Sequence, residues 1–159
     1  MRVAVLTISD SVSRGEREDL SGPAVIAFCR GLNWEVVTRL CVPDDPADIR
    51  QQLREFADKN RIDLILTTGG TGLGPRDNTP EATQAVLDRI VPGIAEEMRR
   101  KGSAKVSTAL LSRAIAGTRH RSLIINLPGS PTGAVESLES VAHLVPHALD
   151  VLTGGNHDQ

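Results

Sequence analysis

A glycine-rich loop is the segment of this sequence best suited to bind an anion. Residues 67–82 read TTGGTGLGPRDNTPEA, and four of the six positions from Gly69 to Gly74 are glycine. Glycine lacks a side chain and tolerates unusual φ angles, so successive backbone N–H groups can converge on one negative group. The segment LPGSP, residues 127–131, adds another glycine at the start of a predicted helix, whose first N–H groups are free. We expect two cradles for phosphate- or carboxylate-sized groups, with glycine-rich turns that bind no ligand as the alternative.

Two common nucleotide-binding motifs do not account for this loop. A P-loop reads G-x-x-x-x-G-K-[ST], and Gly69 and Gly74 have that separation, but Pro75 and Arg76 follow them. The dinucleotide fingerprint reads G-x-G-x-x-G, whereas residues 70–74 read G-x-G-x-G. Any phosphate site in this chain therefore uses another arrangement.

Two aspartates are left over once the predicted helix caps are assigned. In VPDDP, Asp45 directly precedes a proline and fits the cap position, which leaves Asp44. In RDNTP, Thr79 fits the cap before the proline, which leaves Asp77. Mg²⁺ prefers one or two carboxylates with phosphate oxygens and waters, so the pair predicts a magnesium site. The alternative is that both are ordinary solvated loop acids.

Several polar side chains near these loops have two interpretations. Ser9, Asp10 and Ser11 end the first predicted strand, where they bind ligand or cap the loop. Arg76 contacts phosphate or lies on the surface, and Asn126 bonds ligand or braces the loop beside it. Further hydroxyl groups of open use belong to Thr71, Ser107, Ser112 and Ser130.

The composition is that of a globular protein without strong attraction to nucleic acid or membrane. The 159 residues are 40% hydrophobic and 24% charged, with a net charge of −2. The aromatic residues number only three, Phe28, Trp34 and Phe56, which is few for a protein that stacks bases. The apolar run at the N-terminus, about seven residues, is too short for a signal peptide or membrane span. We expect a cytoplasmic protein with one domain, residues 1–153, and a frayed tail, residues 154–159.

The sequence signatures of a metal site are weak, and no Ser-His-Asp catalytic triad is indicated. Cys29 and Cys41 show no ligand spacing, and both fit apolar positions. His143 and His147 are four residues apart, but a proline between them interrupts the helix. The basic run at residues 99–105 is either the exposed side of a helix or a docking surface for an acidic ligand.

The elements that must position these loops alternate between strands and helices. Periodicity predicts strands over residues 2–9, 34–42, 62–68, 114–116 and 123–127, the last two joined by a hairpin-like connection. It predicts helices over 21–32, 45–57, 79–90, 92–101 and 130–145, with Ser21 capping the first. Residues 10–19 are expected to form a loop, and 103–113 fit no clear pattern. The alternation predicts a three-layer α/β sandwich with a mostly parallel sheet, whose ligands bind beyond the carboxyl ends of the strands.

Six stretches of the chain resemble one known family. They are LTISDS, VPDD, LILTTGGTGLGPRDNTPEAT, VPGIAEEMR, LLSRAIAG and LIINLPGSPTGAVESL, which begin at residues 6, 42, 64, 91, 110 and 123. The sequence resembles the molybdenum cofactor biosynthesis family called MogA/MoaB, which includes the plant molybdopterin adenylyltransferase domain and the G domain of gephyrin. The match runs over nearly the whole chain, in order and without a large insertion.

The resemblance implies a fold, a reaction and partners. The implied fold is the α/β fold of molybdenum cofactor biosynthesis proteins, usually assembled as a homotrimer. The implied substrates are molybdopterin, a pterin dithiolene with a terminal phosphate, and Mg-ATP. Active members transfer AMP to that phosphate, release pyrophosphate and so prepare molybdopterin for molybdate insertion. Transient contacts with molybdopterin synthase and the molybdenum insertase are also implied. The alternative is a non-catalytic molybdopterin-binding or assembly module of the MoaB type.

The resemblance also implies roles for individual residues. The critical aspartates of the family fall on Asp44 and Asp77, as catalytic and Mg²⁺-binding residues, and the pterin-site serine of LLSR falls on Ser112. The substrate contacts of the two loops fall on Gly69, Gly70, Thr71, Gly72, Asn126, Pro128, Gly129 and Ser130. Relatives often carry valine where this chain has Asn78, for which we expect only a local loop difference. Retention of both aspartates favours an active enzyme.

Overall fold

A six-stranded sheet forms the centre of the protein, in the order β2-β1-β3-β6-β5-β4. The computed structural model describes residues 1–155, so most of the predicted tail lies outside the described residues. The strands are β1 Arg2–Ile8, β2 Glu35–Val42, β3 Leu64–Thr68, β4 Arg89–Ile90, β5 Ala116–Arg119 and β6 Ser122–Leu127. β2, β1, β3 and β6 are parallel, whereas β5 and β4 add antiparallel pairings. The predicted mostly parallel sheet is confirmed.

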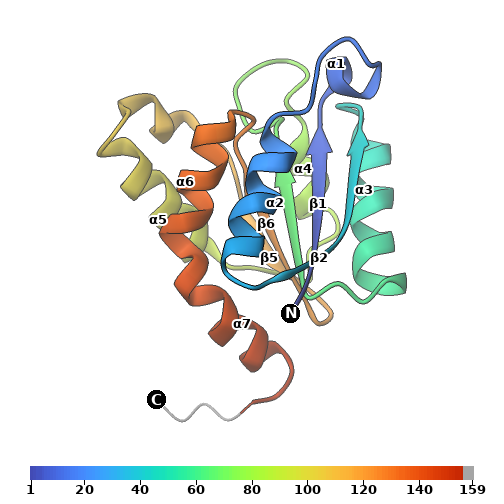
Figure 1. The fold of residues 1–159 in the computed structure, drawn as a ribbon, viewed down its shortest axis with the longest axis vertical. Helices are drawn as coiled ribbons and strands as arrows, with labels where there is room; N and C mark the ends of the chain where they lie inside the picture. Colours follow the sequence, from blue (N-terminus) through green and yellow to red (C-terminus); the bar gives the residue numbers. More distant parts are fainter. Residues whose placement is uncertain (156–159) are drawn as a thin grey trace.

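Helices cover both faces of this sheet (Figure 1). They are α1 Asp10–Ser13, α2 Ser21–Gly31, α3 Pro46–Arg54, α4 Thr79–Gln84, α5 Pro92–Ser103, α6 Pro131–Val141 and α7 Val145–Leu152. A π-helical turn, Glu55–Lys59, extends α3, and short 3₁₀ helices occupy Ser107–Leu111 (η2) and Ala142–Leu144.

Two apolar cores lie on the two faces of the sheet and define the three layers. Alternate residues of β1 point to opposite faces, so Val3 and Val5 pack with α2, α5, α6 and α7. Ala4 and Leu6 pack with α3 and α4. β3 is buried along its whole length because helices cover both of its faces, which explains its continuous apolar sequence. The three-layer prediction is therefore confirmed.

Several local predictions are confirmed by the hydrogen bonds at helix starts. Asp45 caps α3 by accepting from the N–H of Asp48 at 3.1 Å, and Ser130 caps α6 by accepting from the N–H of Gly133 at 2.9 Å. The chain restarts as α7 around Pro146 after a 3₁₀ turn.

The predicted hairpin is present, but β5 runs over Ala116–Arg119 rather than 114–116, and the turn is tighter than expected.

Two predictions for the segment between β1 and α2 are wrong. The expected loop 10–19 begins with α1, which Ser9 caps by accepting from the N–H of Val12 at 3.2 Å. Ser21 does not cap α2, because its hydroxyl pairs with Thr68 Oγ1 at 2.9 Å. Asp19 takes the capping role instead, accepting from the N–H of Gly22 at 3.0 Å.

The predicted helix 79–90 ends at Gln84, and the chain then forms β4. The N–H of Asp88 donates to Thr118 O and that of Val91 to Ala116 O, both at 2.8 Å, so pairing with β5 replaces helix bonds. Proline at position 92 also disfavours a helical conformation at Val91. Within residues 1–155, no helix is both long and apolar enough to cross a membrane.

Candidate functional site

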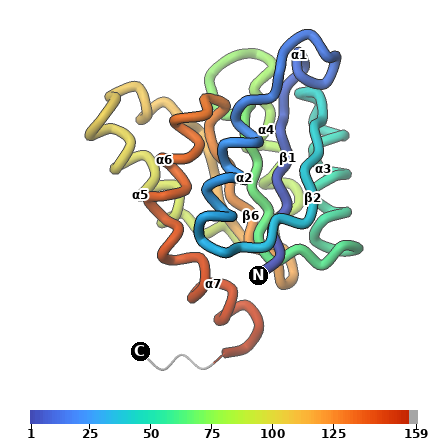
Figure 2. Tube along the Cα trace, in the orientation of Figure 1, coloured from blue at the N-terminus to red at the C-terminus, as the bar shows by residue number. Residues whose placement is uncertain are grey.

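The loops singled out in the sequence meet at the carboxyl ends of the parallel strands. Figure 2 shows the segments that follow β1 and β3 at the same end of the molecule. The glycine-rich loop follows β3 and LPGSP follows β6, its neighbour in the sheet. The N–H of Gly69 donates to Leu127 O at 3.1 Å, which joins the bases of the two loops. The predicted common rim is confirmed.

Two positions in the glycine-rich loop require glycine. Gly69 and Gly70 have φ of +96° and +68°, the left-handed region that side chains disfavour. A Cβ on Gly69 would collide with the carbonyl of Ile8, and one on Gly70 with Oγ1 of Thr79. Thr79 Oγ1 donates to Gly69 O at 2.8 Å, so Thr79 holds this turn and does not cap α4 as predicted.

Backbone donors in both loops are left without a protein partner. Within residues 1–155, the N–H groups of Gly70, Thr71 and Gly72 make no hydrogen bond to protein. The same is true, over that range, of the N–H groups of Gly129 and Ser130. Each loop thus presents adjacent free donors beside the other, which is the chemistry of an anion cradle.

Asp44 and Asp77 line one cavity of about 480 Å³, which we call the aspartate cavity. Its wall also includes Ser9, Gly69, Gly70, Gly129 and Ser130. The fold therefore brings together two carboxylates that are 33 positions apart in the sequence.

Each of these carboxylates is held through one oxygen. Asp77 Oδ2 accepts from the N–H of Gly74 at 2.8 Å, and Asp44 Oδ2 accepts from the N–H of Asp10 at 2.9 Å. Burial raises the pKa of the Asp44 carboxyl, and the negative charges of Asp10 and Asp77 raise it further. Asp44 and Asp77 thus share a region of concentrated negative charge.

The two aspartates fit a magnesium ion. No cluster of three or more His, Cys, Asp or Glu side chains suited to a metal occurs within residues 1–155. The second oxygens of Asp44 and Asp77 have no hydrogen-bond donor in that same part of the chain. Two carboxylate oxygens leave most positions to phosphate oxygens and water, as Mg²⁺ prefers.

Asp10 is engaged by protein rather than free for ligand. Its Oδ1 accepts from the N–H of Asp44 at 3.0 Å, and its own N–H donates to Asp44 Oδ2, so the two residues form a reciprocal pair of hydrogen bonds. The Arg76 guanidinium binds both Asp10 oxygens, at 2.9 and 3.0 Å, and lowers the pKa of the carboxyl. Ser9 caps α1 and also lines the aspartate cavity, so its contact with a ligand stays a prediction. Arg76 forms an ion pair with Asp10.

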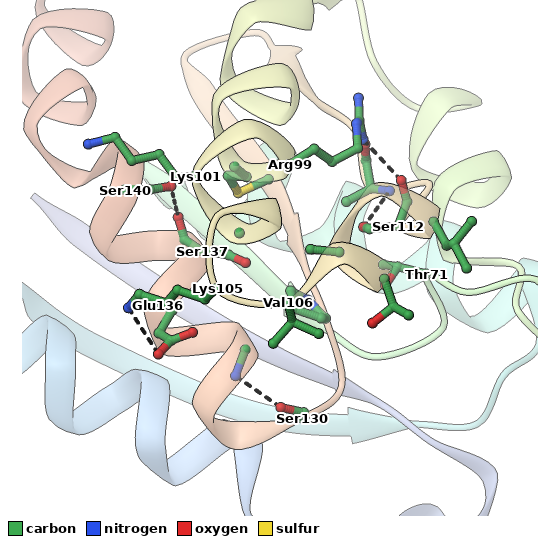
Figure 3. Close-up of a pocket in the computed structure, with 18 of the residues that line it drawn as sticks. Thr71, Arg99, Lys101, Lys105, Val106, Ser112, Ser130, Glu136, Ser137 and Ser140 are labelled. Carbon is green, nitrogen blue, oxygen red and sulfur yellow. Dashed lines mark hydrogen bonds and ion pairs between the residues drawn. The ribbon is translucent and has the colours of Figure 1, made fainter.

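A second cavity, of about 950 Å³, lies between α5, η2 and α6, and we call it the α5–α6 cavity (Figure 3). Thr71, Gly72, Ser112, Pro128 and Ser130 line it. The apolar part of its wall comes from Ala95, Met98, Ala109, Leu111 and Ala114, and Arg99, Lys101 and Lys105 contribute cationic side chains. Ser130 belongs to both cavities, which therefore adjoin at LPGSP.

Asn126 braces the structure beneath the loops. It is fully buried, and its Oδ1 accepts from the N–H of Ile115 at 3.2 Å. Its Nδ2 donates to Thr67 Oγ1 and Thr83 Oγ1, both at 3.0 Å. These bonds use both N–H groups of the amide, so Asn126 braces the loops in this structure, and its contact with a ligand stays a prediction.

Two residues that the sequence did not single out also shape the site. Asp19 lines the aspartate cavity and accepts from Thr7 Oγ1 at 2.7 Å. In the sequence, Asp19 precedes Gly22 by three residues, a spacing typical of a helix cap, and this spacing could have identified it. Arg113 donates to carbonyls of the glycine-rich loop, and its only signal was its place in LLSR.

Comparison with known proteins agrees with this arrangement. A model of the family described as the probable molybdopterin binding domain matches residues 4–147. The chain is 42% identical over 156 residues to the molybdopterin adenylyltransferase of Helicobacter pylori, covering 97% of this chain and 89% of the relative. It is 43% identical over 144 residues to that of Escherichia coli K12, covering 89% and 73%.

A crystal structure shows the same fold. The molybdopterin biosynthesis enzyme MoaB from Thermus thermophilus superposes with a TM-score of 0.91 at 54% sequence identity, over 96% of each chain. These similarities confirm the resemblance indicated by the sequence motifs, and the chain belongs to the family described as the probable molybdopterin binding domain.

Proposed function

We propose that this protein transfers AMP from ATP to the terminal phosphate of molybdopterin and releases pyrophosphate, as a step of molybdenum cofactor biosynthesis. The observation that carries the proposal is the pair of adjoining cavities, one with Asp44 and Asp77 and one with Ser112. Relatives that are 42% and 43% identical over most of the chain are named molybdopterin adenylyltransferase. Two substrates need two neighbouring sites that share a boundary.

The chemistry of each cavity suggests which substrate it receives. The aspartate cavity has carboxylates and the free N–H groups of Gly70 and Gly129, which suit a triphosphate with its cation. The α5–α6 cavity is larger and has apolar walls, which suit a flat pterin ring, with Ser112 available for a polar contact. The terminal phosphate of molybdopterin would then lie near Ser130, where the cavities meet.

Catalysis in this arrangement is mainly positioning. An oxygen of the molybdopterin phosphate attacks the α-phosphorus of ATP, a new P–O bond forms, and the bond to pyrophosphate breaks. The free N–H groups of Gly70, Thr71 and Gly72 would bind phosphate oxygens and hold the reactants in line. Mg²⁺, when bound by Asp44 and Asp77, would offset the repulsion between the phosphates.

Assembly and location complete the proposal. A homotrimer is supported by an exposed apolar surface at the α5–α6 cavity, whose wall includes Leu73, Val106 and Leu111. Together with Leu110, these side chains are 55–68% exposed. Contacts with molybdopterin synthase and the molybdenum insertase, and a cytoplasmic location, follow from the proposed reaction. The composition supports neither nucleic acid nor membrane as a partner.

The test is pyrophosphate release from Mg-ATP, measured with and without molybdopterin. We expect release only when both substrates are present, and a loss of at least about a hundredfold in Asp77→Asn. Asp48→Asn, which changes an exposed aspartate of α3, is the matched control and should turn over normally. Normal turnover in Asp77→Asn would remove that residue from the mechanism. Binding of molybdopterin without any pyrophosphate release would favour the non-catalytic module.

A further inference from the structure

Arg113 connects the two cavities through a set of short hydrogen bonds to the glycine-rich loop. Its backbone N–H donates to Thr71 O at 2.9 Å, and its Nε donates to Gly72 O at 2.7 Å. Its Nη2 donates to Asp77 O at 2.7 Å, and its Nη1 pairs with the carboxylate of Glu81. One residue thus binds four acceptors spread over eleven positions of the chain, from 71 to 81.

These bonds control the direction of groups that face the cavities. A guanidinium holds its donors in a rigid planar fork, so bonds to Gly72 O and Asp77 O set the separation of the two ends of this loop segment. The peptide group is planar, so fixing the carbonyl of Thr71 also fixes the N–H of Gly72, one of the free donors. The Asp77 carboxylate lies over the same glycine, because a Cβ on Gly72 would be 2.8 Å from Asp77 Oδ2.

Arg113 itself lies behind the loop and lines neither cavity. Its side chain is 33% exposed and that of Glu81 is 60% exposed, so the ion pair between them adds little to stability. The bonds to backbone carbonyls are therefore the distinctive contacts of this guanidinium.

The residue before it belongs to the other cavity. Ser112 lines the α5–α6 cavity, and its carbonyl accepts from Arg99 Nη1 at 3.2 Å. Ser112 and Arg113 are joined by one peptide bond, so a ligand that displaced Ser112 would also move the backbone of Arg113. The bonds of Arg113 to Gly72 O and Asp77 O would pass this movement to the glycine-rich loop.

We infer that Arg113 is a positioning residue that couples the two cavities, so that occupation of the α5–α6 cavity tightens nucleotide binding in the aspartate cavity. The inference rests on the proposed function for the identity of the two ligands. Coupling of this kind is reciprocal, because a ligand at either site must change affinity at the other by the same factor.

The test measures the Kd of Mg-ATP by calorimetry, with and without molybdopterin, together with pyrophosphate release. In the unaltered protein we expect molybdopterin to tighten ATP binding by about fivefold or more, the usual lower range of coupling between sites. Arg113→Lys keeps the charge but lacks the fork, and its two Kd values should agree within about twofold. The Kd of ATP alone should weaken in this variant, because the same bonds position the N–H of Gly72, and thermal unfolding of the same sample shows whether the variant is folded.

Arg119→Lys is the matched control. Arg119 also binds a carboxylate through a fork, that of Asp58 at 2.8 and 3.0 Å, and donates to Val86 O at 2.9 Å. It lies in the hairpin at the other end of β6, away from both cavities. We expect this variant to keep the full coupling.

The outcomes separate the inference from the proposed function. Full coupling in Arg113→Lys, or no coupling in the unaltered protein, overturns the inference even if turnover is normal. Absence of turnover in the unaltered protein overturns the proposed function, whereas coupled binding that is lost in Arg113→Lys still supports the inference. If Arg113→Lys does not fold, Arg113→Gln replaces the fork with a single amide donor that cannot bind Gly72 O and Asp77 O together. Full coupling in Arg113→Gln would then overturn the inference.

Discussion

At the scale of single residues, the charge of the Asp44 carboxylate at the rim opposes folding. Asp44 is half-buried close to Asp10 and Asp77, and its pKa is raised first by burial and then by these charges. A carboxyl with a raised folded-state pKa binds its proton more readily when folded, so its ionisation at neutral pH opposes folding. Perturbed pKa values of this kind are common at sites where charge is needed for binding.

Asp44→Asn should therefore stabilise the protein while removing activity. We expect a higher Tm than that of the unaltered protein at pH 7, because asparagine keeps an acceptor for the N–H of Asp10 without the charge. The difference should shrink as the pH falls through the raised pKa of Asp44, where the native carboxyl also becomes neutral.

Thermal unfolding across a pH series, with pyrophosphate release at each pH, measures both effects. Asp48→Asn, at an exposed position in the first turn of α3, provides the control and should not raise Tm, because it removes a carboxylate that the helix N-terminus stabilises. A lower Tm for Asp44→Asn at pH 7 would contradict this reading of the charge.

At the scale of elements, two segments that enclose the aspartate cavity are joined by an ion pair. Asp10 begins α1 and Arg76 belongs to the glycine-rich loop, and the guanidinium binds both carboxylate oxygens. Asp10 also exchanges two hydrogen bonds with Asp44, so the segments after β1, β2 and β3 are held together at one point. The arrangement fixes Asp44 relative to the loop that carries Asp77.

Asp10→Ala should reduce turnover more than it reduces stability. Loss of the acceptor for the N–H of Asp44 would let this carboxylate move, and small displacements of positioning groups cost roughly ten- to a hundredfold in rate. Because Arg76 lowers the pKa of Asp10, the stabilising contribution of Asp10 is present at neutral pH and is lost as the pH falls through that lowered value.

Pyrophosphate release and urea unfolding, measured on the same samples, separate the two effects. Glu16→Ala removes an exposed ion pair with Arg14 in the neighbouring segment, and it should change neither quantity much. Equal effects of Asp10→Ala and Glu16→Ala on turnover would show that the pair with Arg76 does not position Asp44.

On the scale of the whole molecule, exposed apolar side chains gather at the α5–α6 cavity. Leu73, Val106, Leu110 and Leu111 come from the glycine-rich loop and the η2 region, and each is more than half exposed. Clustered apolar side chains of this size mark interaction surfaces more often than solvent-facing ones. Because Leu73, Val106 and Leu111 line the α5–α6 cavity, a subunit contact there would include part of the wall of the proposed pterin site.

We expect light scattering to give a mass three times that of the 17.0 kDa chain. Leu110→Lys should shift the protein toward monomer, because a charge would be buried in the contact. Leu32→Lys, at an exposed leucine that ends α2, should leave the mass unchanged. A monomeric unaltered protein would refute the trimer, and a trimeric Leu110→Lys would place the contact on another surface.

The sequence by itself determined the features that depend on near neighbours in the chain. The apolar periods of β1, β3 and α6, the caps Asp45 and Ser130 and the two glycine-bearing loops all follow from residues within a few positions of one another. The predictions for Thr79 and Ser21 were wrong because both hydroxyls bond to β3 or to the loop after it, and such distant partners leave no mark in local spacing.

Only the tertiary structure decided which polar groups meet. In the folded chain, Asp44 and Asp77 line one cavity. Asn126 forms hydrogen bonds that brace the loops, and Arg113 donates to the loop that contains Asp77. The helix predicted over 79–90 gave way to β4 for the same reason, since β5 supplied hydrogen bonds that the local sequence cannot reveal. The physical reason is that local preferences are weak, about 1 kcal/mol or less per residue, and long-range pairing and burial outweigh them.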